Sequence, residues 1–183
     1  MKPSLVLHGL LNLVNFYMTI EVIENFLPEQ EYKEIYTYLH SHQFPWYYND
    51  GKVRDNDGIL QLTHCFYRGV GAHSNWLKLL APIAERLKVT APIKIKANTT
   101  FGLPNKVQSG FHVDGVGQDL THRKTAIFYL SDTNGPTLFK DPEQEVECKQ
   151  NRIVKFDAHH EHAGVLHEGD PSSRRIVINF NYY

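Results

Sequence analysis

Cysteine, net charge and long hydrophobic runs are all scarce in this sequence. Cys65 and Cys148 are its two cysteines, and they form no CxxC pair. A disulfide framework is therefore not expected, and a reducing, cytoplasmic setting is. Nineteen lysines and arginines nearly balance 20 acidic residues, and the formal net charge is −1. This balance argues against partners such as nucleic acid or an anionic membrane, which bind strongly basic surfaces.

A mostly apolar stretch covers residues 5–18, and it is the segment that comes nearest to a targeting signal. Polar residues such as His8 and Asn12 interrupt it, and no small-residue cleavage site follows, so it does not match a secretory signal. It is also too short and too polar to span a membrane. No linker or internal repeat divides the chain. We therefore expect one domain over residues 1–183, with 1–17 as an N-terminal extension.

The first half of the chain carries two helical patterns. Pro28 and the acidic residues after it suit the first turn of a helix, and apolar residues follow at helical spacing, which predicts a helix over 28–41. Ser74 is a typical N-cap for a second helix over 74–87. Between them lies a loop or irregular hairpin at 46–58. Short strands are expected over 20–26 and 59–67.

From residue 91 onward, short strands alternate with turns. Turn signals include the Asp-Thr-Asn-Gly sequence at 132–135. The expected strands cover residues 92–101, 110–113, 124–130, 136–140, 144–148, 152–157, 163–167 and 174–182. Eight short strands without helices between them indicate a two-sheet or closed β structure. Helices placed before the sheets are expected to buttress one face, which gives an α+β, mostly β architecture.

The segment around His112 and Asp114 is the first one with metal-binding character. Residues two apart on a strand share a face, so these two side chains could reach one ion. One nitrogen and one hard oxygen ligand suit Fe(II), Mn(II) or Zn(II).

A histidine-rich turn after the strand expected at 152–157 offers the third ligand. Two histidines and one carboxylate leave three adjacent coordination positions open, as in the facial triad of non-haem Fe(II) oxygenases. Chemistry alone leaves four candidates for the second histidine. They are His159, His160, His162 and His167.

The last strand pattern begins with two arginines, Arg174 and Arg175. Strand alternation turns one of them inward. A buried guanidinium is costly unless it binds an anion, and its fork matches a carboxylate in bidentate geometry. The strand therefore predicts a carboxylate-binding position near the metal ligands.

These elements in this order resemble the 2-oxoglutarate and Fe(II)-dependent dioxygenases, most closely the prolyl 4-hydroxylase-like branch. The family pattern is His-x-Asp, a distal histidine several strands later and a basic residue on the following strand. The segments 125–130 and 134–139 also match, and so does Phe156-Asp157, whose spacing to the distal histidine selects His162. The resemblance covers about residues 92–183 and implies a double-stranded β-helix, or jelly roll, there.

The resemblance also implies roles for single residues. His112, Asp114 and His162 would hold Fe(II), and Arg175 would bind the far carboxylate of 2-oxoglutarate, assisted by the Tyr129 hydroxyl. The reaction implied consumes O2, decarboxylates 2-oxoglutarate to succinate and hydroxylates an unactivated C–H bond, with ascorbate as a supporting reductant. Many members carry a second tyrosine shortly before His-x-Asp. Here Phe101 and Gly102 occupy that stretch, and the candidates to replace the tyrosine are Asn98, Thr99 and Thr100.

The branch resembled suggests a small-molecule or peptidyl substrate, such as a peptidyl or free amino acid, whereas the charge balance disfavours a nucleobase. The segments 44–58 and 102–110 could flank the mouth of the jelly roll. The aromatic candidates to line that mouth are Trp46, Tyr47, Tyr48 and Phe66.

Two other classes of protein compete with an oxygenase. A cupin-like metal-binding β-barrel would keep the histidines without needing Arg175, and the basic residue after the distal histidine argues against it. A structural or interaction protein with a vestigial site would have lost a ligand, whereas all three are present here.

Overall fold

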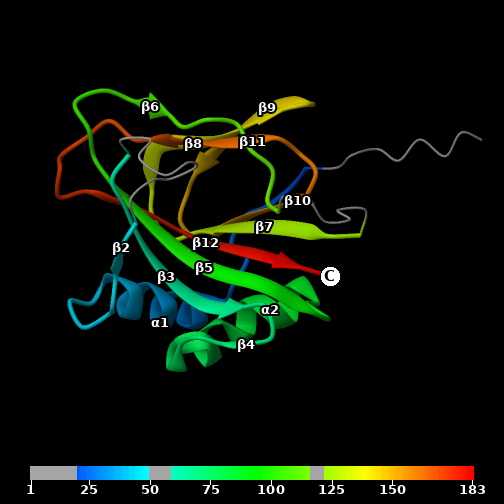
Figure 1. Cartoon of the computed structure of the whole chain (residues 1–183). Helices are drawn as coiled ribbons and strands as arrows, with labels where there is room; N and C mark the ends of the chain where they lie inside the picture. Colours follow the sequence, from blue (N-terminus) through cyan, green and yellow to red (C-terminus); the bar gives the residue numbers. More distant parts are fainter. Residues whose placement is uncertain (1–19, 50–58, 116–121) are drawn as a thin grey trace, which may run out of the picture.

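Two antiparallel β-sheets face each other in the computed structural model, which describes residues 20–49, 59–115 and 122–183 (Figure 1). The larger sheet has the strand order β1-β10-β7-β12-β5-β3-β2, with β4 beside β3. Its strands are β1 (Glu21–Ile23), β2 (Tyr47–Asn49), β3 (Gln61–Arg68), β4 (Gly71–Ala72), β5 (Pro92–Phe101), β7 (Lys124–Tyr129), β10 (Arg152–Asp157) and β12 (Arg174–Tyr182). The N-terminal extension expected at 1–17 lies outside the described residues.

The smaller sheet has the order β6-β11-β8-β9 and lies over the inner face of the larger one (Figure 1). Its strands are β6 (Val107–Gln108), β8 (Thr133–Lys140), β9 (Glu143–Cys148) and β11 (His162–Leu166). A small apolar core that includes Tyr129, Phe139 and Phe156 fills part of the space between the sheets. This two-sheet arrangement confirms the mostly β, jelly-roll architecture predicted from the sequence.

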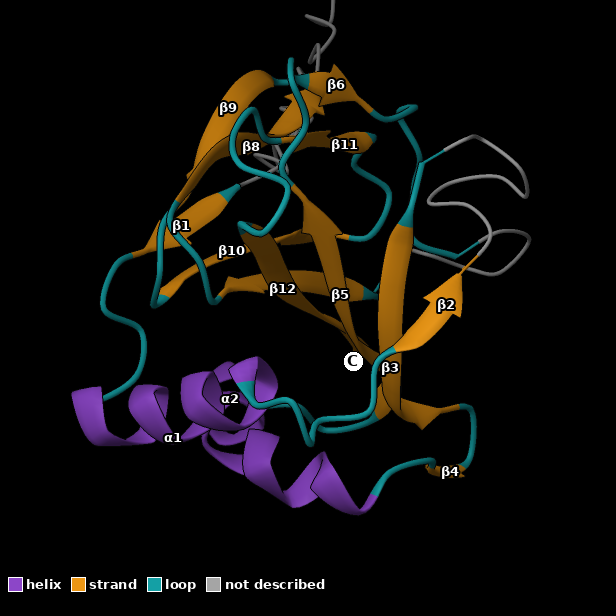
Figure 2. Cartoon of the chain, turned by 90° about the vertical axis from the view of Figure 1, so that its left-hand side faces the viewer, coloured by secondary structure: helices purple, strands orange, loops and turns teal. Residues whose placement is uncertain are grey.

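Helices α1 (Glu29–His40) and α2 (Ala81–Leu87), with the 3-10 helix η1 (Asn75–Leu80), cover the outer face of the larger sheet (Figure 2). The Ser74 hydroxyl accepts a hydrogen bond from the Trp76 amide, which confirms Ser74 as the N-cap of the second helical segment. Lys88 ends α2 in the left-handed conformation. Among the described residues, no helix is long and apolar enough to cross a membrane.

The main hydrophobic core lies between these helices and the larger sheet. On β5 and β12, the residues that face the helices are apolar, for example Ile95, Ala97, Ile176 and Ile178, all of them almost fully buried. Because side chains alternate along a strand, the residues between them face the smaller sheet. The predicted buttressing of one face by the N-terminal helices is therefore confirmed, and it leaves the other face free to carry a site.

Two of the predicted elements are wrong. Residues 110–113 form no strand; His112 makes an isolated bridge with His162 instead. Residues 133–135 of the turn expected at 132–135 belong to β8, which begins at Thr133 and shifts register between Thr133 and Thr137. A β-bulge of this kind absorbs turn-forming residues within a strand, so the local composition suggested a turn where pairing across the sheet continues.

Gly135 lies in this bulged part of β8, where the backbone at the end of the neighbouring strand β11 leaves no room for a side chain. A Cβ atom there would lie 2.4 Å from the Val165 carbonyl oxygen and 2.9 Å from the His167 amide nitrogen. Gly135→Ala is therefore expected to lower the free energy of unfolding by about 1–3 kcal/mol. Thermal melting should show a loss of several degrees. Gly71→Ala is the matched control, because a Cβ at Gly71 would meet nothing within 4 Å; equal losses in both would contradict the steric explanation.

Candidate metal centre and ligand pocket

A cavity of about 320 Å³ lies between the two sheets. Its floor, called the pocket floor below, is the inner face of β5 and β12. Strand pairing arranges the floor in four rows: Thr100 with Arg175, Asn98 with Val177, Lys96 with Asn179, and Lys94 with Asn181. The space between packed sheets is normally apolar. A polar floor in that position indicates a ligand site rather than a packing core.

His112 and His162 stand side by side across this cavity because their backbones are paired. Each amide donates to the carbonyl of the other residue, at 3.0 Å and 2.9 Å, in an antiparallel bridge. Residues directly opposite each other in such a bridge project to the same side. The two imidazole rings accordingly lie with their centroids 4.6 Å apart.

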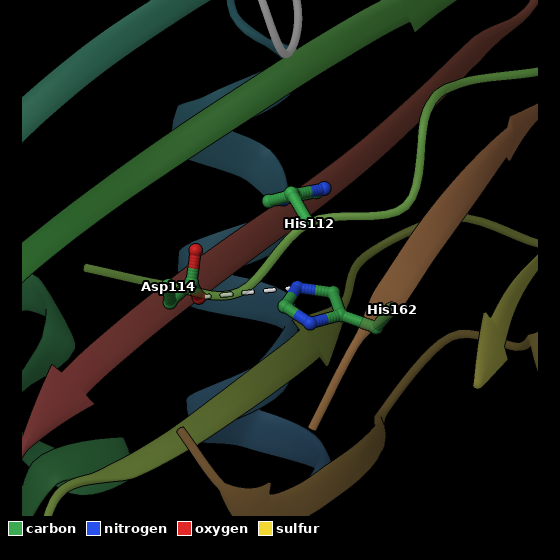
Figure 3. Close-up of side chains that lie close together, drawn as sticks. All are labelled: His112, Asp114 and His162. Carbon is green, nitrogen blue, oxygen red and sulfur yellow. Dashed lines mark ion pairs between the residues drawn. The ribbon is translucent and has the colours of Figure 1, made fainter. Parts of the chain in front are cut away.

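Asp114 completes the group from the loop after His112 (Figure 3). One ligand atom from each of the three residues lies within 4.8 Å of the others, and the Asp114 Oδ2 atom is 3.9 Å from His162 Nε2. Asn181 on the pocket floor donates a hydrogen bond from Nδ2 to Asp114 Oδ2 at 2.8 Å, and also to Thr125 Oγ1. The Asp114 carboxylate, which lies outside the strands, is thereby tied to the larger sheet.

The hydrogen bonds of the two histidines determine which ring nitrogen can bind an ion. His112 Nδ1 lies 3.3 Å from the Gly110 carbonyl oxygen, and His162 Nδ1 lies 3.1 Å from the His160 carbonyl oxygen. A carbonyl only accepts, so both Nδ1 atoms carry the hydrogen and the lone pair of each ring lies on Nε2. Two imidazole nitrogens and one carboxylate fit a divalent transition metal, with Fe(II) among those that accept this set.

The other candidate histidines are not brought to Asp114. His167 Nε2 bonds to the Ser173 hydroxyl, and His160 Nδ1 bonds to the Asp141 carbonyl. His159 and His160 instead form a separate group with Asp157, whose carboxylate already pairs with Lys124. Among the described residues, His162 is the one of the four candidate histidines that lies in a group with His112 and Asp114.

Arg175 lines the inner end of the pocket, and its side chain is buried. Its Nε donates to the Gly135 carbonyl at 2.7 Å, and its NH2 group donates to the Thr137 hydroxyl at 3.2 Å. No carboxylate among the described residues pairs with it. Arg174, by contrast, faces the helical layer and donates to the His40 carbonyl. A buried, anchored guanidinium without an acidic partner has the chemistry that suits an anion.

Tyr129 lies one step behind this position rather than in it. It is fully buried, and its hydroxyl donates to Thr137 Oγ1 at 2.8 Å, while Thr137 itself lines the pocket. Burial raises the pKa of the Tyr129 hydroxyl far above its ordinary value, so it stays a neutral donor. Thr137, which sequence reasoning missed, is therefore the pocket hydroxyl that links Tyr129 to Arg175.

The residues proposed to replace the missing second tyrosine divide by strand alternation. Asn98 and Thr100 line the pocket, whereas Thr99 does not. The side-chain oxygens of Asn98 and Thr100 are buried and have no hydrogen-bond partner. Buried polar atoms are usually satisfied, so both oxygens are available to a ligand.

The four aromatic residues expected at the pocket mouth are placed elsewhere, and none of them lines the cavity. Phe66 is fully buried in the core beneath the helices, and Trp46 packs against that core and donates to the Leu39 carbonyl. Tyr47 and Tyr48 are exposed on β2 and do not line the cavity. Phe66 and Trp46 thus belong to the main core, and most of the residues that line the pocket are polar.

Asn179, Asn181, Lys94 and Lys96 are pocket residues that the sequence reasoning did not single out. Strand alternation could have identified them. Once Arg175 faces inward, every second residue of its strand faces inward too, and two of these are asparagines. The same count along β5 selects its two lysines. Polar residues at the inward positions of otherwise apolar strands are the pattern of a lined pocket.

No protein-family model and no curated protein matches the sequence. Solved structures do match. A 2OG-Fe(II) oxygenase family oxidoreductase from Burkholderia pseudomallei has 11% identity and a TM-score of 0.66, over 89% of this chain and 84% of that one. The prolyl hydroxylase from Trichoplax adhaerens, solved with a hypoxia inducible factor peptide, has 14% identity and a TM-score of 0.63, over 90% and 83%.

A third similar structure is the non-heme alpha ketoglutarate dependent epimerase SnoN from nogalamycin biosynthesis. It has 15% identity and a TM-score of 0.67, over 91% of this chain and 78% of that one. The chain therefore has the fold of the 2-oxoglutarate and Fe(II)-dependent oxygenases, the class suspected from the sequence. Prolyl hydroxylases are among the proteins that share it. Proteins with this one fold catalyse different reactions, so the function has to be inferred from the residues of the site.

Proposed function

We propose that this protein is a 2-oxoglutarate- and Fe(II)-dependent oxygenase, with the metal held by His112, Asp114 and His162. The observation that carries the proposal is the combination in one cavity of three converging metal ligands and a buried arginine without an acidic partner. A cupin-like metal protein would need the first feature and not the second. The fold shared with oxygenases of this class supports the same reading.

The protein's part in the reaction is to bind, orient and exclude water. Bound Fe(II) and 2-oxoglutarate would supply the activation of O2 and the oxidation of a C–H bond. Arg175, held by the Gly135 carbonyl and Thr137, would fix the far carboxylate of 2-oxoglutarate. The Tyr129 hydroxyl would act through Thr137, keeping the threonine hydroxyl in one orientation.

For the prime substrate, we infer that the enzyme hydroxylates a peptidyl or free amino acid. Its support is the likeness to prolyl hydroxylases, one of them solved with a peptide. Since an epimerase has the same fold, epimerisation is the alternative reaction. Localisation in the cytoplasm remains an expectation from the cysteine content alone.

The first test is succinate formation from 2-oxoglutarate under air, with Fe(II) and ascorbate. Oxygenases of this type turn over slowly without their prime substrate, so the target need not be known. Succinate is expected in the wild type only when Fe(II) is present, and it should be lost in both His112→Ala and Arg175→Ala. The same samples should be titrated with Zn(II) and 2-oxoglutarate. Metal binding without any binding of 2-oxoglutarate would overturn the proposal in favour of the cupin-like alternative.

Asn181 is expected to act as a positioning residue for the metal centre. Asn181→Ala removes the hydrogen bond that holds the Asp114 carboxylate and should lower the affinity for a divalent metal by roughly 10–100-fold. Calorimetric titration with Zn(II) measures this without turnover. Asn179→Ala is the matched control, since Asn179 lies on the same face of the same strand and bonds to Asn98 instead. A control that loses as much affinity would count against a specific role for Asn181.

A further inference from the structure

Three cations gather at the outer end of the pocket, away from Arg175. Lys94 and Lys96 lie on the pocket floor, and Arg68 is the cross-strand partner of Lys94 on β3. We call this group the cationic rim. Like charges placed directly opposite each other on neighbouring strands destabilise a sheet. A loss of sheet stability of this kind at the mouth of a pocket indicates that the charges serve a function.

No acidic residue among the described ones forms an ion pair with Lys94, Lys96 or Arg68. The carboxylate that interacts electrostatically with Lys96 is Asp114, which the metal would occupy. Burial and the nearby Lys94 lower the pKa of Lys96 to about 8, and Asp114 opposes the shift. A half-buried ammonium group with like-charged neighbours is stabilised when an anion binds beside it.

The cationic rim and Arg175 lie at opposite ends of the pocket floor. Lys96 pairs with Asn179, four residues along β12 from Arg175, which corresponds to about 14 Å between backbones. The metal ligand Asp114 is bonded to Asn181 in the outermost row, next to the rim. The order along the pocket is therefore Arg175, then the middle rows, then the metal group and the rim.

A buried polar atom without a hydrogen-bond partner lies between these two ends of the pocket. Asn98 lies between the Lys96 and Thr100 rows, is 7% exposed, and its Oδ1 atom has no hydrogen-bond partner. Its amide group already donates to Asn179, so the free oxygen can accept a hydrogen bond from a ligand. A second molecule bound beyond 2-oxoglutarate would find an acceptor as well as cations.

We propose that the outer end of the pocket binds an anionic group of the prime substrate, a carboxylate or a phosphate, through Lys94 and Lys96. This inference rests on the proposed function in treating that anion as part of the molecule to be oxidised. It narrows the substrate to an acidic compound that carries its charge close to the oxidised carbon. Lysine ammonium groups act as point charges and suit either anion.

The test measures the protection of single lysines from an amine-reactive reagent, in the Zn(II)-loaded protein saturated with 2-oxoglutarate. Acetylation with acetic anhydride is followed at each lysine by peptide mass spectrometry. The probes are N-acetyl-L-alanine, inorganic phosphate and the neutral N-acetyl-L-alaninamide. Lys94 and Lys96 should be acetylated severalfold more slowly with at least one of the two anions. The neutral amide should leave their rates unchanged, and the exposed Lys78 is the internal control.

Two variants keep the result specific. Lys96→Gln should weaken the protection of Lys94 by the anion, because one of the two charges is gone. In Arg175→Met, the protection should persist, because the two anion positions are separate. Protection by neither anion, equal protection by the neutral amide, or loss of protection in Arg175→Met would each overturn the inference.

The outcome also separates this inference from the proposed function. If 2-oxoglutarate does not bind the wild type while the anions still protect Lys94 and Lys96, the oxygenase proposal fails and the anion site stands. If 2-oxoglutarate binds and neither anion protects, the oxygenase proposal stands and the acidic substrate is rejected. The carboxylate and phosphate arms identify which anion the substrate carries.

Discussion

Replacing His162 with alanine is expected to lower the affinity for a divalent metal at least about 100-fold, and with it the Fe(II)-dependent formation of succinate. This expected loss of metal affinity is larger than the loss typically seen when a residue that only supports a metal ligand is replaced. His162 is almost fully buried, and its Nε2 atom lies 3.9 Å from Asp114 Oδ2. Anaerobic titration with Co(II), followed by its visible absorption, measures the affinity directly.

His160→Ala is the matched control for this prediction. His160 lies two residues away, is equally buried, and bonds to the Asp141 carbonyl instead of pointing to Asp114. Its loss should lower the thermal stability and leave Co(II) binding nearly intact. If His160→Ala removed the metal as completely as His162→Ala, the assignment of the distal ligand would have to move to the Asp157 group.

Replacing Arg175 with methionine is expected to raise the dissociation constant for 2-oxoglutarate by roughly 30-fold or more. Truncating one partner of a buried, hydrogen-bonded charge pair costs about 2–5 kcal/mol, and each 1.4 kcal/mol is about tenfold in affinity. The measurement is calorimetric titration of the Zn(II)-loaded protein, which avoids turnover. Metal affinity should change little, because Arg175 contacts none of the three metal ligands in the hydrogen bonds it makes.

Two substitutions test whether the loss belongs to this one guanidinium. Arg174→Met removes the neighbouring charge, which faces the helices and donates to the His40 carbonyl; the affinity for 2-oxoglutarate should stay within about twofold of the wild type. Tyr129→Phe removes one neutral hydrogen bond, made to Thr137, and should cost a few-fold. A larger loss in Arg174→Met than in Arg175→Met would reverse the inward assignment.

The parts of the fold that followed from the sequence are those with strong local periodicity. Helix α1 was predicted over 28–41 and is observed at Glu29–His40. The strands expected at 92–101 and 174–182 are observed at the same positions as β5 and β12. In each of these elements, the alternation or spacing of apolar residues is written in the segment itself.

The parts that failed depend on partners distant in the sequence. His112 was expected on a strand, but its geometry comes from one pair of hydrogen bonds with His162, which no local pattern encodes. Phe66 was expected at the pocket mouth, but its side of β3 faces the helices. The parity of a strand is visible in a sequence, whereas the face that meets the ligand is set by which sheet or helix packs against it.

The pocket floor and the main core share the same two strands, back to back. Lys94, Lys96, Asn98 and Thr100 alternate along β5 with residues that pack under the helices, and β12 repeats the arrangement. Point substitutions on the ligand side can therefore retune what the protein recognises without disturbing the core, so new specificities are accessible by single amino-acid changes. A one-residue insertion or deletion in either strand would exchange the two faces beyond it. The site can therefore evolve by amino-acid replacement, whereas changes in the length of these strands would disrupt it.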